Sequence, residues 1–192
     1  MTFLQLKKKF KKHGITTVGM GDLCNSRMSR LLEQINSGES RIVVIDGVAV
    51  RIVETVIVRV TREVNSTLEQ KLVEVERREV RGKTIHCELL DGIGKKIQRG
   101  ETPSLAAERC LRVKLGFRGL RSIHYEKSDE IISTDDSPLP SRILLTRRHF
   151  FCCKIPKRLY KLVYVQRYPG RHTATFRWLP VENQLGREVQ IL

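Results

Sequence analysis

The chain has 192 residues, 40% of them hydrophobic, which is enough for one domain of ordinary size plus an extension. Its 36 lysines and arginines outnumber 21 aspartates and glutamates, so the formal net charge is +15. Such a charge favours RNA, a nucleotide or an anionic protein as partner, and the alternative is a basic subunit of an assembly. No apolar run approaches the roughly 20 residues that cross a bilayer, so no transmembrane segment is predicted.

The cysteines and histidines predict neither a disulfide framework nor a zinc site. The five cysteines form no CxxC pair, and an odd number is unsuited to a disulfide framework. The five histidines lack the HxH or HxxxH spacing that brings two ring nitrogens to one metal ion. These patterns favour a reducing intracellular compartment and a chain without a metal site.

The first 21 residues contain no acidic side chain. Phe3, Leu6 and Phe10 recur at helical spacing, and lysines at positions 7, 8, 11 and 12 lie on the opposite face. This pattern fits three alternatives: a solvated basic arm, a helix that binds an anionic surface, or an organelle-targeting segment. The protein is accordingly expected in the cytoplasm, or in a mitochondrion or plastid if this segment directs import.

A second helix and a hairpin are expected next. Asp22 suits the helix N-cap, apolar residues recur at helical spacing over 28–35, and Gly38 suits the helix end. Asp46-Gly47 lies between two β-branched runs, which predicts a hairpin with a two-residue turn. Alternation and turn residues predict further strands at residues 54–64, 70–80, 83–90, 142–155, 157–168 and 173–181. A terminal helix is also expected.

The segment 94–117 is predicted to be a loop that leads into a helix. Thr102 is a suitable N-cap and Pro103 suits the first helical turn, so the helix should run from Pro103 to Leu115 and end at Gly116. Most of its apolar side chains fall on one side, which we expect to face a core.

Six residues of this segment resemble, in order and spacing, the signature box of the Nudix hydrolase superfamily: Gly100, Glu101, Arg109, Leu111, Gly116 and Phe117. The frame between Glu101 and Phe117 needs no gap. The resemblance implies an α+β fold, namely an α/β/α sandwich with a mixed, mainly antiparallel sheet. It extends over about residues 51–192 and leaves residues 1–50 as a basic extension with two short helices and the start of a hairpin.

The resemblance implies a structural role for Gly100, Glu101, Arg109 and Gly116. In that family, the residues at positions 101 and 109 form an ion pair that holds the loop against the helix. The alternative is an exposed ion pair, which would contribute only about 0 to 1 kcal/mol.

The departures from the box concern the metal ligands. In the family, three carboxylates of the helix hold a divalent metal ion, and the matching positions here are Cys110, Val113 and Lys114. Magnesium prefers oxygen ligands, and a lysine ammonium would repel it. No cofactor is therefore expected. If the protein is nevertheless active with Mg²⁺ or Mn²⁺, the candidate catalytic carboxylates are Glu101, Glu108 and Glu182.

Two basic regions are candidate anion-binding surfaces. The first set, predicted to bind phosphate without metal, is Lys95, Lys96, Arg99, Lys114, Arg118 and Arg121. In the second, residues 145–178, cations alternate with aromatic residues that could stack on bases. The alternative for the first set is a solvated face, and for the second a core of aromatic side chains with cations pointing outward.

Three functions remain open from the sequence. The first is a catalytically inactive Nudix-like protein that binds RNA, nucleotide phosphate or a protein assembly. The second is an active metal-dependent hydrolase of nucleoside diphosphate derivatives with unusual ligands. The third is a structural subunit of an organellar ribonucleoprotein or another complex.

Overall fold

The computed structural model describes residues 1–16, 26–64, 69–79, 82, 84–86, 92–117, 123–134, 143–168 and 172–181. The chain divides into two compact units. The first unit comprises Met1–Ile57, Gly94–Cys110 and Tyr125–Phe151, and the second comprises Val58–Ile93, Leu111–His124 and Cys152–Leu192. The first unit includes residues from both sides of residue 50, and the domain boundary expected there stays a prediction.

The first unit contains two helices from the N-terminal part of the chain, the start of a third, and strands of a mixed sheet. Strands β6, β7 and β2 are successive neighbours, and β1 and β5 also pair with β2. The elements that contribute to this unit are α1 (Phe3–Lys12), α2 (Ser26–Asn36), β1 (Arg41–Ile45), β2 (Val48–Glu63), β5 (Ile93–Lys96), α3 (Pro103–Leu115), β6 (Ile123–Thr134) and β7 (Ile143–Lys154).

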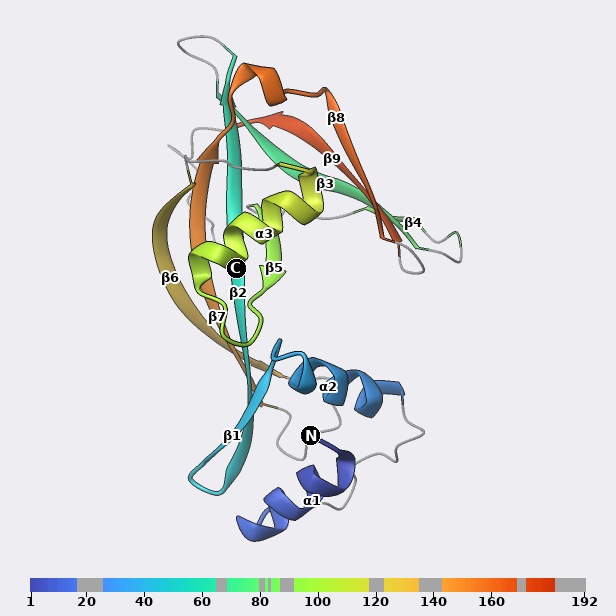
Figure 1. Cartoon of the computed structure of the whole chain (residues 1–192), viewed down its shortest axis with the longest axis vertical. Helices are drawn as coiled ribbons and strands as arrows, with labels where there is room; N and C mark the ends of the chain where they lie inside the picture. Colours follow the sequence, from blue (N-terminus) through green and yellow to red (C-terminus); the bar gives the residue numbers. More distant parts are fainter. Residues whose placement is uncertain are drawn as a thin grey trace, which may run out of the picture. The chain divides into compact units, whose positions relative to one another are not determined.

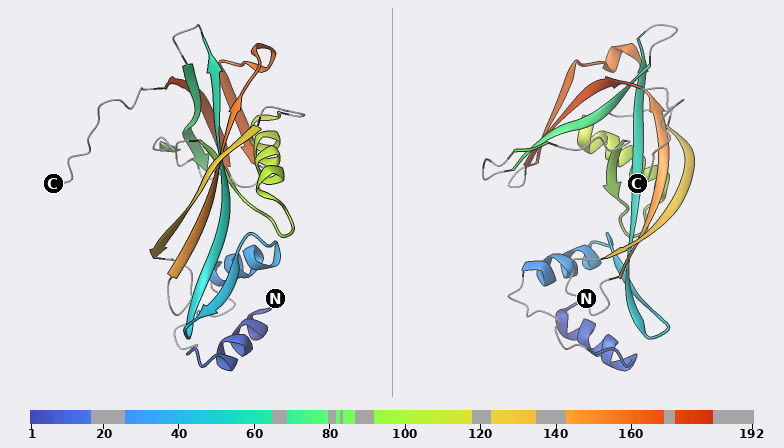
Figure 2. Two further views of the ribbon diagram at one scale, coloured as in Figure 1. Left: turned by 90° about the vertical axis from the view of Figure 1, so that its left-hand side faces the viewer. Right: turned by 180° about the vertical axis from the view of Figure 1, so that it is seen from behind.

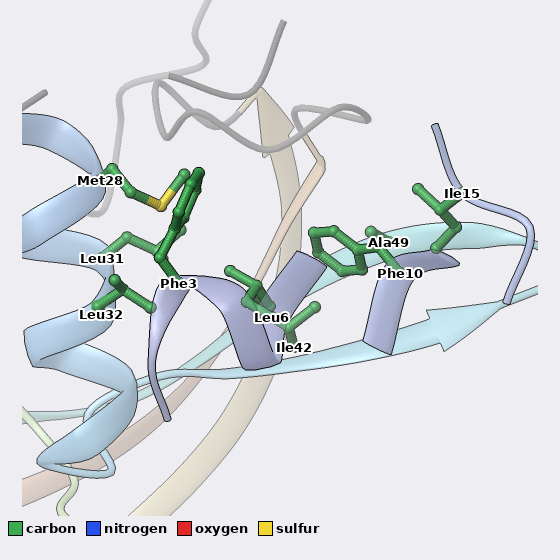
Figure 3. Close-up of a cluster of buried hydrophobic side chains, with 9 residues drawn as sticks. All are labelled: Phe3, Leu6, Phe10, Ile15, Met28, Leu31, Leu32, Ile42 and Ala49. Atoms are coloured by element: carbon green, nitrogen blue, oxygen red, sulfur yellow. The ribbon is translucent and has the colours of Figure 1, made fainter. Parts of the chain in front are cut away.

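A hydrophobic cluster joins α1, α2 and the β1–β2 hairpin (Figure 3). Helix α1 contributes Phe3, Leu6 and Phe10, and the last two have no exposed surface. Burial of a large apolar side chain stabilises the folded state by about 1.5 to 3 kcal/mol. The N-terminal helix is therefore packed into the first unit. The other members of the cluster are Ile15, Met28, Leu31, Leu32, Ile42 and Ala49.

The second unit is built on an antiparallel part of the sheet. In it β2 pairs with β3 (Glu69–Glu79), which pairs in turn with β9 (His172–Pro180), and β9 pairs with β8 (Val163–Tyr168). The short β4 (Thr84–His86) also pairs with β3. Strands β3, β9 and β8 lie side by side in both views of Figure 2 and in Figure 1. A register shift between Glu74 and Glu76 marks a bulge in β3.

Several sequence predictions are confirmed. The fold is α+β with a mixed sheet. Helix α3 has the predicted bounds, and the hairpin turn has positive φ at Asp46 (49°) and at Gly47 (76°), as a two-residue turn between antiparallel strands requires. The predicted cap at Asp22 and the predicted terminal helix lie outside the described residues.

One strand prediction is wrong, and one strand was not predicted. Residues 157–168 are not one strand, because Lys157–Leu159 forms a 3-10 turn after Pro156, closed by the bond from Leu159 N to Pro156 O at 3.0 Å. Strand β6 was not predicted, because Ile123–Thr134 is rich in charged residues and lacks an apolar alternation. It lies at one end of the strand order, where charged side chains protect an edge from unwanted pairing.

Candidate functional site

The loop before α3 and the first half of the helix place Gly100, Glu101 and Arg109 of the box in the first unit, whereas Leu111, Gly116 and Phe117 belong to the second. Thr102 caps the helix, since its Oγ1 accepts a bond from Leu105 N at 3.3 Å. Gly100 has φ of 77°, a left-handed conformation that favours glycine. The predicted cap is thus confirmed, and the turn at Gly100 directs the Glu101 side chain back toward the loop.

Glu101 and Arg109 form a bidentate ion pair. Arg109 Nε donates to Glu101 Oε1 at 2.6 Å, and a terminal nitrogen of Arg109 donates to Oε2 at 2.7 Å. The same terminal nitrogen donates to Lys96 O at 2.7 Å, and Gln98 N donates to Glu101 Oε2 at 3.0 Å. The two side chains are only 12% and 13% exposed, so this is not the exposed pair of the alternative interpretation. Helix, loop and β5 are held together at one point.

The pair is stabilised in its charged form. Hydrogen bonds from Arg109 lower the pKa of Glu101, the bond from the Gln98 backbone lowers it further, and burial opposes both. The hydrogen bonds with Glu101 raise the pKa of Arg109. Both oxygens of the carboxylate are therefore engaged by donors, and Glu101 is poorly disposed to bind a metal ion or to accept a proton from water.

An open pocket of about 450 Å³ adjoins this pair within the first unit. Its walls come from the loop around Arg99 and from the segment between α2 and β1 with the neighbouring part of β2. Charges of both signs line it: the cations are Lys9, Arg41 and Arg99, and the acids are Glu39, Glu54 and Glu101. Arg41 pairs with Glu54 at 3.1 Å, whereas no described carboxylate pairs with Arg99. Arg99 is the exposed cation that remains available to an anionic ligand.

Gly38 brings the end of α2 into direct contact with this loop. A Cβ on Gly38 would lie 2.3 Å from Arg99 Cβ and 2.7 Å from Arg99 N, and the residue has φ of 77°. Only glycine fits both the conformation and the close approach. The sequence indicated Gly38 only as the end of a helix; its contact with residue 99 depends on tertiary packing.

Positions 110, 113 and 114, which match the metal-binding carboxylates of the box that this segment resembles, do not suit a divalent cation. Cys110 is fully buried, Val113 is half-buried without a ligating atom, and Lys114 carries a positive charge. Glu108 is exposed on α3, and Glu182 lies outside the described residues. In the described part of the chain, no three histidine, cysteine or acidic side chains are grouped as a metal site.

Lys114 belongs to the second unit, where it pairs with an acid of the sheet. Its Nζ lies 3.7 Å from Glu74 Oε2 and 6.0 Å from the ring centre of Phe176. Arg77 binds the other oxygen of Glu74 at 2.7 Å. Glu74 is only 7% exposed, and sequence analysis did not single it out, although Leu72 two residues earlier on the strand is a core residue. Lys114 is therefore engaged by an internal acid.

The other predicted phosphate ligands are distributed as follows. Lys95 and Lys96 lie half-buried on or next to the loop, and the charge of Lys95 contributes to the lowered pKa of Glu101. Arg118 and Arg121 lie outside the described residues. Of the predicted set, the structure places Lys95, Lys96 and Arg99 together near the Glu101–Arg109 pair.

The described aromatic residues of the second basic region are buried or half-buried. Tyr164 is buried, and its hydroxyl donates to Leu159 O at 2.6 Å. Trp178 is also buried, and its Nε1 donates to Lys161 O at 2.8 Å. The guanidinium of Arg62 stacks 3.6 Å over Tyr160. These rings are engaged within the second unit, which favours the structural interpretation of this region.

Comparisons with known proteins find similarity only at the level of structure. No protein-family model matches the chain, and no curated protein does. The chain is similar to solved structures of Nudix proteins. The NUDIX domain of NrtR from Shewanella oneidensis, complexed with ADP ribose, matches with 14% identity over 69% of this chain and 75% of that chain, at a TM-score of 0.43.

Two further matches have similar values. A MutT/nudix family protein from Enterococcus faecalis matches with 11% identity over 94% of this chain and 56% of that chain, at a TM-score of 0.42. The Nudix hydrolase RenU from M. smegmatis matches with 12% identity over 73% of this chain and 79% of that chain, at a TM-score of 0.37. A shared fold does not imply a shared activity, so the role of each residue rests on the geometry described above.

Among the described helices, none is long and apolar enough to cross a membrane.

Proposed function

We propose that this chain is a Nudix-like protein that binds a phosphate-bearing ligand, a nucleotide or an RNA phosphate, without hydrolysing it. The proposal rests on the resemblance of segment 100–117 to the Nudix box and on the geometry of its structural residues and its metal-ligand positions. The structural half, Glu101 with Arg109, is retained as a bidentate pair. The half that would hold metal is replaced by a thiol, a valine and a lysine.

The observation that carries the proposal is that the charged side chains of the box, Glu101 and Lys114, are already held in ion pairs within the protein. Both oxygens of Glu101 accept hydrogen bonds from Arg109, and Lys114 pairs with Glu74 at 3.7 Å. A carboxylate in a bidentate pair with an arginine has little capacity left for a metal ion. The described part of the box thus favours a binding role over phosphoanhydride hydrolysis.

The pocket beside the box loop is the proposed ligand site. Arg99 is exposed there and no described acid pairs with it, so a phosphate would gain a charge-assisted hydrogen bond without breaking an internal ion pair. The volume of about 450 Å³ lies in the range of ligand pockets. Glu39 and Glu54 in the wall can accept hydrogen bonds from ligand hydroxyl or amino groups.

A turnover assay tests the loss of catalysis. The purified protein is incubated with a panel of nucleoside diphosphate derivatives, with and without Mg²⁺ or Mn²⁺, and we expect no product above the protein-free control. Turnover that a Glu101→Gln variant abolishes would instead support an active hydrolase with unusual ligands. The triple variant Cys110→Glu, Val113→Glu, Lys114→Glu tests whether carboxylates at these positions produce turnover.

A binding assay tests the pocket. We expect ADP to bind in isothermal titration calorimetry and Arg99→Gln to weaken binding by roughly 10- to 100-fold, since a hydrogen bond to a charged group contributes about 1.5 to 3 kcal/mol. Arg30→Gln is the matched control, because Arg30 is an exposed cation of α2 outside the pocket. Equal weakening by both variants would refute the assignment of the site.

A further inference from the structure

Helix α1 has two different faces in the structure. Phe3, Leu6 and Phe10 point into the cluster shared with α2 and the β1–β2 hairpin (Figure 3). On the rest of the helix, Lys8, Lys11 and Lys12 are exposed. These three residues are called the lysine ridge below. The helix is thus anchored by its apolar side and presents its lysines outward.

Both ends of α1 are held in place. At the start, Gln5 N donates to Thr2 Oγ1 at 3.3 Å and Thr2 N donates to Gln5 Oε1 at 2.7 Å, which forms a capping box. At the end, Gly14 has φ of 69° and Ile15 N donates to Phe10 O at 3.0 Å, while the Ile15 side chain is buried. The lysine ridge therefore lies on a helix that is capped at both ends.

The lysines of α1 divide into engaged and outward residues. Lys9 Nζ donates to Ile42 O at 3.1 Å, and Lys7 Nζ lies 4.4 Å from the centre of the Phe3 ring. No described residue forms an ion pair with the lysine ridge. The first 21 residues of the sequence hold no acid that could do so.

The spacing of the ridge matters because it places like charges together. Lys8 is three residues before Lys11 and four before Lys12, so the three ammonium groups lie on one face of the helix. Like charges at such spacings destabilise a helix by a few tenths of a kcal/mol per pair. A chain of phosphates would remove this repulsion and would release the counterions that the phosphates hold.

We propose that the lysine ridge of α1 is a docking surface for the phosphate backbone of a nucleic acid. The proposal is independent of the ligand pocket, because none of the three ridge residues lines that pocket. A polyanion matches three outward cations that no described acid neutralises. Insertion of α1 into a membrane would require its apolar face, and that face is buried in the cluster.

The test measures how binding depends on salt. Oligouridine RNA and oligothymidine DNA of equal length are titrated with the full chain by fluorescence anisotropy at several salt concentrations. The triple variant Lys8→Gln, Lys11→Gln, Lys12→Gln should reduce the slope of log affinity against log salt by about 2, because each phosphate contact on a single strand contributes about 0.7. The oligonucleotide that shows this reduction identifies RNA, DNA or both as the source of the phosphates.

The matched control removes the same charge elsewhere. Arg30, Arg112 and Lys127 are exposed cations outside the ridge, the pocket and residues 145–178, and their replacement by glutamine also removes three positive charges. The control should leave the slope unchanged, and a triple lysine-to-arginine variant of the ridge should retain binding. Circular dichroism should show that the ridge variants do not lower the melting temperature, since the three side chains are exposed and the glutamine variant only removes their mutual repulsion.

Two outcomes would overturn the proposal. The first is an equal loss of slope in the ridge variant and in the control, which would make net charge alone the cause. The second is ridge-dependent binding to vesicles of phosphatidylcholine and phosphatidylserine when neither oligonucleotide binds, which would assign the ridge to an anionic membrane surface.

Discussion

Helix α3 supplies the cation of two ion pairs that differ in geometry. At the middle of the helix, Arg109 is the cation and the preceding loop supplies the acid Glu101, in a bidentate pair with a shortest distance of 2.6 Å. Near the end, the helix supplies Lys114 and strand β3 supplies Glu74, at 3.7 Å. Glu74 is bound more closely by Arg77, at 2.7 Å.

The difference shows which positive charges are available to a ligand. From the sequence, Lys114 was expected to be an unpaired cation at a position that holds a metal ligand in the family that the box resembles. In the structure, the buried carboxylate of Glu74 engages it, because a charge in a low-dielectric environment requires a partner. We therefore propose Arg99 in the pocket and the lysine ridge as anion-binding positions, rather than the end of α3.

The largest expected effect on stability comes from loss of the ion pair between Arg109 and Glu101. Arg109→Met should lower the free energy of unfolding by about 3 kcal/mol, because it leaves Glu101 charged and nearly buried without its partner. Urea denaturation measures this change. Arg112→Met on an exposed position of the same helix is the control and should cost no more than about 0.5 kcal/mol. Equal costs for both variants would make the pair unimportant for stability.

The second prediction compares Arg77 and Lys114, the two cations that contact Glu74, by their contributions to stability. Glu74→Gln should cost about 1 to 2 kcal/mol, because it removes the charge that both Lys114 and Arg77 share. Lys114→Gln should cost less than about 1 kcal/mol, since Arg77 still satisfies the carboxylate. Thermal or urea unfolding of both variants provides the measurement. A larger cost for Lys114→Gln would contradict the ranking of the two contacts.

The smallest effect is a pH dependence of stability that comes from the pair of Glu101 and Arg109. Because the pKa of Glu101 is lowered in the folded state, its charge stabilises the fold above the unfolded value of about 4.3, and this contribution is lost as the pH falls through the lowered folded pKa. The stability difference between the unaltered protein and Glu101→Gln should thus be constant near neutral pH and shrink below about pH 4.3. A difference that grows on acidification would contradict this assignment.

Much of the fold could be predicted from local patterns. Thr102, Pro103 and Gly116 delimit α3, and the positive φ expected at Asp46-Gly47 is present. These features depend on backbone preferences and bonds between near neighbours, which sequence patterns contain. Strand β6 was missed because its charged composition resembles a loop, and only pairing with β7 makes it a strand.

The candidate site was predictable in part. The resemblance to the Nudix box implied the pair of Glu101 and Arg109, and the structure brings the two side chains together with the Lys96 carbonyl as an additional acceptor. The wall of the pocket formed around Gly38 and Glu54 was not predictable, since its residues lie more than 40 positions from the box. Such a wall depends on how α2 and β2 pack against the loop.

The sequence by itself determined the start and end of α3, the Glu101–Arg109 pair and the amphipathic character of α1. The helix ends and the amphipathic character follow from capping and helical periodicity, whereas the pair was implied by the resemblance to the Nudix box. Only the tertiary structure decided that Lys114 meets Glu74, that Gly38 touches Arg99, and that the apolar face of α1 is buried while its lysine ridge is exposed. The physical reason is that these contacts join residues far apart in the chain, and their geometry depends on strand register, on the bulge in β3 and on core packing.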